Sequence, residues 1–210
     1  MINPTGLRWL LTVLFVLPAL YALWLAAAPG RRTLPGRVSH VLHAVMGVAM
    51  AAMVWPWGMG LPADPQVVVF SAGALWFAAT PWFRSPGTEP RRARFLAAVP
   101  HVVMMLAMAW MAAVMDGAAT ASGGHGGGHD MPGMDMSGPD AVGAMSLTGT
   151  GQQWTAALLA VFLTAVGLLW LSRAFDRGRV AASPKRDDGA AEPACHAAMA
   201  VGMAVMFLLL

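Results

Sequence analysis

One spacing of histidine and methionine occurs three times in this 210-residue chain. The segment 43–53 reads HAVMGVAMAAM, 101–111 reads HVVMMLAMAWM and 196–206 reads HAAMAVGMAVM, so each follows the pattern H-x-x-M-x-x-x-M-x-x-M. For a chain with 17 Met and 6 His, simple template counting predicts roughly 0.003 chance occurrences of this pattern. The residues between the shared positions differ, so the spacing itself is what the three segments have in common.

On an α-helix this spacing places all four side chains on one face, which we call the His/Met stripe. At about 100° per residue, the histidine and its three methionines fall within an arc of roughly 80°. They form successive rungs that are roughly 4.5–6 Å apart along the helix axis. The three stripes supply one histidine rung (His43, His101, His196) and three methionine rungs (Met46, Met104, Met199; Met50, Met108, Met203; Met53, Met111, Met206).

The ligand type indicates which metal such rungs would bind. Thioether sulfur is a soft and neutral ligand, and soft ligands select Cu(I). Ag(I) is soft for the same reason and would act as a surrogate. Ca²⁺ and Mg²⁺ prefer carboxylate oxygen, which the stripes do not offer. Conduction of an ion requires several adjacent sites that bind weakly enough to release it, so the stripes predict a Cu(I) path.

The composition indicates that membrane-spanning helices carry these stripes. The chain is 58% hydrophobic and 11% charged, which is too apolar for an ordinary soluble domain. Apolar stretches long enough to cross a bilayer as helices are predicted at 7–28, 38–58, 66–83, 95–116, 152–173 and 194–210. The stripes fall on the second, fourth and sixth of these. We therefore predict an all-α integral membrane protein with six transmembrane helices.

The basic residues predict how this protein is oriented. Twelve of the thirteen lie in or beside the loops that follow the first, third and fifth helices. The positive-inside rule assigns these loops to the cytoplasm, so both termini and the loop between helices four and five face outward. We expect a multi-pass protein of the plasma (inner) membrane. Its basic charge then reflects topology and contact with membrane lipid, and no nucleic-acid partner is expected.

A second repeat predicts how the helices are grouped. The segment LWLAAAP at 23–29 matches LWFAATP at 75–81, and LWL at 169–171 echoes the first part. Each lies near the cytoplasmic end of an odd-numbered helix, and a stripe follows on the next helix. We predict three parallel two-helix repeats with pseudo-threefold symmetry about the membrane normal. The predicted divisions are hairpin repeat 1 (1–60), hairpin repeat 2 (61–116), a flexible outer loop (117–150) and hairpin repeat 3 (151–210).

Further candidate ligands lie at the two ends of the predicted path. The outer loop is rich in Gly, Ser, Pro, His and Met and lacks periodicity, which is typical of a segment that need not fold. Its ligands suit the capture of copper from an outer donor: His125, His129, Met131, Met134 and Met136. At the other end Cys195 precedes His196 and offers a thiolate for transfer to a copper chaperone inside. The affinity of the ligands for Cu(I) therefore rises from the outer His/Met loop to the inner thiolate, and this gradient indicates import.

These features resemble those of the Ctr-type copper transporters. Those trimers line a threefold pore with a Met-x-x-x-Met pair and carry outer Met motifs and a Cys/His cytoplasmic end. Here the pairs Met46/Met50, Met104/Met108 and Met199/Met203 match residue type for residue type, and MPGMDM at 131–136 resembles the capture motif. Six helices in one chain and histidines on the stripe depart from the Ctr pattern. The layout also resembles a family of uncharacterised actinobacterial polytopic membrane proteins.

Other interpretations of the stripes remain open. Methionine fills gaps in hydrophobic cores, so the stripes could serve packing in a scaffold, and Met105, which lies off the stripe, is expected to face lipid or to pack. His40 either extends the first stripe or lies at the membrane interface. A protein that holds Cu(I) for storage or cuproenzyme assembly would carry the same ligands without flux. A b-type cytochrome would pair histidines at two depths, whereas the stripe histidines share one depth.

The sequence contains no feature that points to an enzyme. It has no nucleotide-binding loop, no acid–base pair and no carboxylate metal site. We therefore expect a protein that transports or binds metal.

Overall fold

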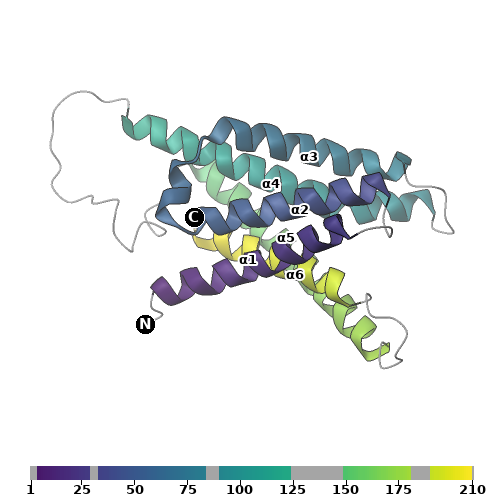
Figure 1. The fold of residues 1–210 in the computed structure, drawn as a ribbon. Coiled ribbons are helices and arrows are strands. Elements are labelled where there is room, and N and C mark those ends of the chain that lie inside the picture. Colours follow the sequence, from purple (N-terminus) through teal and green to yellow (C-terminus); the bar gives the residue numbers. More distant parts are fainter. Residues whose placement is uncertain (1–3, 29–32, 84–89, 124–148, 181–189, 210) are drawn as a thin grey trace. The chain divides into compact units, whose positions relative to one another are not determined.

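The computed structural model describes residues 4–28, 33–83, 90–123, 149–180 and 190–209. Within these ranges the chain forms six α-helices and one short 3₁₀ helix and contains no strand. The elements are α1 (Pro4–Ala27), α2 (Leu34–Met53), η1 (Pro56–Gly60), α3 (Ala63–Phe83), α4 (Arg91–Gly123), α5 (Thr150–Val180) and α6 (Ala191–Leu209) (Figure 1). The prediction of an all-α protein is confirmed.

Five helices in the described part of the chain are long and apolar enough to cross a membrane. They are Thr5–Ala27, Ala63–Phe83, Arg91–Asp116, Thr150–Arg179 and Ala191–Leu209. The chain is therefore a multi-pass membrane protein. The remaining helix, α2, has 20 residues but is less apolar because it carries Arg37, His40 and His43. The prediction of six spanning helices is thus confirmed for five of them.

The helix ends differ from the predicted spans for local reasons. Helix α2 ends at Met53 rather than near residue 58, because Pro56 has no backbone N–H and restricts the residue before it to an extended conformation. Trp55 accordingly has φ −104° and ψ 146° and leads into η1. Helix α5 continues to Val180 rather than ending near residue 173. Arg177 and Arg179 occupy its last turn, where positive charge stabilises the helix terminus.

The chain folds into two compact units, Met1–Val54 with Val142–Leu210, and Trp55–Ala141. In the first unit, α1 packs along α2 and also against α6, and α5 packs along α6. In the second unit, α3 packs along α4 (Figure 1). Each pair of consecutive helices, α1–α2, α3–α4 and α5–α6, therefore forms a hairpin.

Two glycines allow α1 to approach both α2 and α6 closely. A Cβ atom added to Gly202 would overlap the ring of Phe15, and one added to Gly47 would lie 2.9 Å from Cβ of Ala19. Phe15 is fully buried at 0% exposure. Small residues at such contacts are how membrane helices gain packing energy without a hydrophobic effect between them. Helix α1 therefore holds α2 and α6 in one unit.

We predict that Gly202→Ala destabilises the protein by about 1–3 kcal/mol, because the added methyl group overpacks a buried contact. The matched control is Gly178→Ala in α5, where nothing lies within 4 Å of the added Cβ. Alanine is the better helix former, so the control should unfold at the same temperature or a higher one. Thermal unfolding in detergent measures both variants. Equal midpoints for the two would contradict the close packing of Phe15 on Gly202.

Candidate metal centre

The His/Met stripe of α2 is the buried face of that helix. Met46 and Met50 are 0% exposed, and His43 and Met53 are also buried. The opposite face carries exposed valines, Val41, Val45 and Val48. The predicted ligands therefore point away from the lipid-facing side of α2.

The stripes of α4 and α6 are buried in the same way. Met199 and Met203 on α6 are buried, while His196 and Met206 are partly exposed. On α4 the three stripe methionines are buried and His101 is partly exposed. Of the eleven largest fully buried side chains in the described residues, eight are methionines: Met46, Met50, Met104, Met105, Met108, Met111, Met199 and Met203. Met105 is thus a packing residue and does not face lipid.

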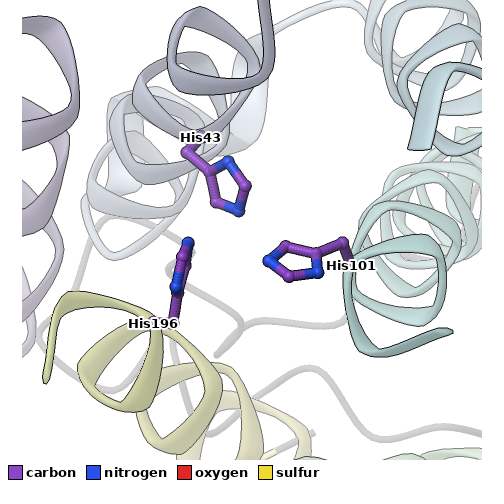
Figure 2. A group of neighbouring side chains, drawn as sticks. All are labelled: His43, His101 and His196. Atoms are coloured by element: carbon purple, nitrogen blue, oxygen red, sulfur yellow. The ribbon is translucent and has the colours of Figure 1, made fainter. Parts of the chain in front are cut away.

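The first unit brings two of the stripe histidines together. The rings of His43 on α2 and His196 on α6 have centroids 4.7 Å apart and planes inclined by 55°. Figure 2 shows both side chains extending from their helices toward each other, and it also labels His101, which α4 of the second unit carries. Two imidazoles this close, held by separate helices, are able to share one metal ion.

Backbone hydrogen bonds determine which nitrogen of these rings carries a lone pair in the neutral form. Nδ1 of His43 lies 2.7 Å from the carbonyl oxygen of Ser39, and Nδ1 of His101 lies 3.2 Å from that of Ala97. A carbonyl oxygen only accepts, so Nδ1 carries the hydrogen and, in the neutral ring, the lone pair that is able to bind a metal is on Nε2. Histidines that bind metals are commonly oriented by such a bond from the second nitrogen.

An aromatic ring from the same hairpin lies against two of the histidines. Trp170 on α5 is 5.0 Å from His196 between ring centroids, with an interplanar angle of 38°. Phe77 on α3 stacks on His101 at 5.2 Å and 23°. Trp170 and Phe77 both belong to the repeated Leu-Trp segments of the odd-numbered helices. Those segments therefore provide the side chains that flank the histidines.

A small cavity lies beside the His43–His196 pair. It measures about 10 Å³, which is room for about one water-sized occupant. Helices α1, α2 and α6 line it with Pro18, Tyr21, Ala22, Leu25, His40, His43, Glu192, Cys195, His196 and Met199. Four predicted ligands, His43, Cys195, His196 and Met199, thus meet at one cavity together with an imidazole, a phenol and a carboxylate.

The cavity also contains residues that the stripe pattern did not predict. Glu192 precedes Cys195 by three residues and His196 by four, so all three share a side of α6, and this spacing could have identified it. Tyr21 comes from α1, which has no stripe, and no sequence signal points to it. His40 lines the cavity and is 7% exposed. The predicted outer ligands His125, His129, Met131, Met134 and Met136 lie outside the described residues.

Comparison with known proteins identifies the family. Residues 35–210 match DUF5134, a domain of unknown function. The chain belongs to the DUF5134 family. It is 43% identical over 116 residues to the uncharacterized proteins Rv0970 of Mycobacterium tuberculosis and Mb0995 of Mycobacterium bovis. That match covers 55% of this chain and 53% of each relative, so the chain spans about half the length of the curated relatives it matches.

This family membership and the mycobacterial relatives confirm the predicted resemblance to an uncharacterised actinobacterial family. They assign no activity, and the likeness to Ctr-type transporters stays a prediction. No solved structure matches the chain.

The contact between Trp170 and His196 generates a spectroscopic prediction. A soft cation bound at His196 lies close to the indole, where the π-system attracts it, so Ag(I) or Cu(I) should quench the emission of Trp170 in a saturable way. Trp170→Phe should remove this component. The matched control is Trp24→Phe. Trp24 has the same position in the Leu-Trp-Leu segment of α1, where its ring is 61% exposed, so this variant should be quenched as strongly as the wild type. Persistence of the quench in Trp170→Phe would show that metal does not bind beside His196.

Proposed function

We propose that this protein transports Cu(I) across the plasma membrane along a path that α2, α4 and α6 line. One observation carries the proposal: all three His/Met stripes are buried helix faces. The two inner methionines of each stripe, Met46 and Met50, Met104 and Met108, and Met199 and Met203, are each at most 1% exposed. Ligands for an ion that crosses a bilayer have to be shielded from lipid and repeated along the crossing, and these residues meet both conditions.

The charge of the ligands suits a monovalent soft ion. Carboxylates within a membrane are costly, and the stripes contain none. Neutral thioethers avoid this cost and replace the hydration shell of Cu(I), which their softness favours. Successive weak sites let the ion pass from rung to rung. The protein then needs no enzymatic activity, and Ag(I) should follow the same path.

We infer that the three stripes face a common axis, with His43, His101 and His196 at one depth. The repeated hairpins support this arrangement, as do the matching Nδ1 bonds of His43 and His101 and the aromatic neighbours of His101 and His196. In this proposal α2 is the sixth spanning helix, and three hairpin repeats have pseudo-threefold symmetry.

Direction follows from the two ends of the path. The outer loop with His125, His129, Met131, Met134 and Met136 captures copper from a donor outside. Cys195 and the histidines receive it on the cytoplasmic side, where a copper chaperone accepts it. Both termini then face outward.

A second candidate function is the retention of Cu(I) for storage or cuproenzyme assembly without transport. The cavity beside His43 and His196 favours it, because a thiol and several imidazoles meet there and a thiolate is a stronger ligand for Cu(I) than a thioether. Measurement of flux separates the two candidates.

The decisive variant changes one methionine in each stripe, Met50, Met108 and Met203, to leucine. Leucine preserves volume and apolarity, so the fold should survive, while the sulfur ligands of one rung are lost. We expect uptake of Cu(I) into proteoliposomes to fall by about tenfold or more. Met105→Leu is the matched control, because Met105 is equally buried but lies off the stripe, and it should keep wild-type flux.

The other possible results of the flux and binding measurements distinguish transport from storage and from packing. Bound copper without flux in the wild-type protein would favour storage or assembly. A wild-type protein that binds no copper would mean that the stripes serve packing alone. Equal flux in the triple variant and the wild type would contradict the thioether path.

A further inference from the structure

We propose that Cys195 and His40 are ligands of a Cu(I) site in the cavity of the first unit, where the ion leaves the path. This inference rests on the proposed function, since the path delivers the ion. It adds His40 as a ligand and places the terminal site within α1, α2 and α6 alone.

The order of residues along two helices places this site beyond the histidine pair. On α2, His40 comes one turn before His43, and Met46 and Met50 follow. On α6, Cys195 comes directly before His196, and Met199 and Met203 follow. The His43 and His196 rings lie 4.7 Å apart between centroids, and His40 and Cys195 each precede the histidine of their own stripe. Both line the same small cavity.

The wall of the cavity contains both apolar side chains and further donors. Helix α1 closes one side of the cavity with Pro18, Ala22 and Leu25, which offer no donor atom, and with Tyr21. His40 is buried, whereas Cys195 is a free and only partly buried cysteine. His43, His196 and Met199 line the same cavity and offer further nitrogen and thioether donors, which suit a soft ion such as Cu(I).

The chemistry favours transfer of the ion from the imidazole pair to this site. A thiolate is a softer ligand than imidazole or thioether, and soft ligands select Cu(I). When Cys195 binds, its S–H bond breaks, an S–Cu bond forms and the proton passes to water, which reaches the partly buried thiol. Copper remains Cu(I) throughout. The thiolate and Cu(I) together carry no net charge, so the bound state avoids an unpaired charge in an apolar setting.

Cys195 is the only cysteine in the chain, so its alkylation reports on this site alone. We expect Cu(I), supplied under anaerobic conditions to the detergent-purified full chain, to slow labelling by N-ethylmaleimide about tenfold, because a metal-bound thiolate is a poor nucleophile. His40→Gln should abolish most of this protection. His40→Met supplies another soft ligand and should restore it. Glu192→Gln is the matched control, because Glu192 lines the same cavity but offers a hard oxygen ligand, and it should keep full protection.

The same assay separates failure of this site from failure of the path. The variant with Met50, Met108 and Met203 changed to leucine should lose flux and still protect Cys195. Labelling that Cu(I) does not slow in the wild type would overturn the site even if flux is intact. Undiminished protection in His40→Gln would exclude His40 as a ligand of the bound ion. Equal protection by Zn²⁺ at the same concentration would overturn selectivity for Cu(I).

Discussion

The close approach of α1 to two other helices determines where the candidate ligands of the first unit meet. Gly47 and Gly202 leave no room for even a methyl group beside Ala19 and Phe15, so α2 and α6 are both held against one helix. His43 and His196 come into ring contact as a result, and the cavity forms where α1 covers them. In a bilayer, where lipid is as apolar as the helices, such close packing stabilises association and fixes the position of the ligands.

The candidate ligands of this unit change in character along the helices. Met46, Met50, Met199 and Met203 are neutral and deeply buried, which suits brief binding of a soft cation. Imidazoles follow, and then a partly exposed thiol with a carboxylate nearby. Ionisable side chains are thus concentrated at one end of the two stripes, whereas the buried methionines are side chains that cost little to bury.

The three repeats agree in their ligands and differ in their packing. Four residues after each stripe histidine stand Gly47, Met105 and Ala200. Gly47 lets α1 pack closely on α2, whereas Met105 occupies the corresponding position of α4 with a fully buried side chain. The aromatic neighbours also differ, because Phe77 lies one position further along its Leu-Trp segment than Trp170 does. The spacing of histidine and methionine is therefore common to all three hairpins, while their interhelical contacts are not.

The sequence by itself determined the helices, the hairpins and the buried stripe faces. Periodicity and hydropathy are local properties, so they placed Met50, Met108 and Met203 correctly on the buried faces of their helices. The end of α2 depended on Pro56. The burial of Met105 depended on the side chains around it. Only the tertiary structure decided that His43 meets His196, that Trp170 lies against His196, and that Tyr21 and His40 share a cavity with Cys195. These contacts join helices distant in the chain, and they depend on where side chains such as Phe15 allow backbones to approach. No spacing within a single helix contains that information.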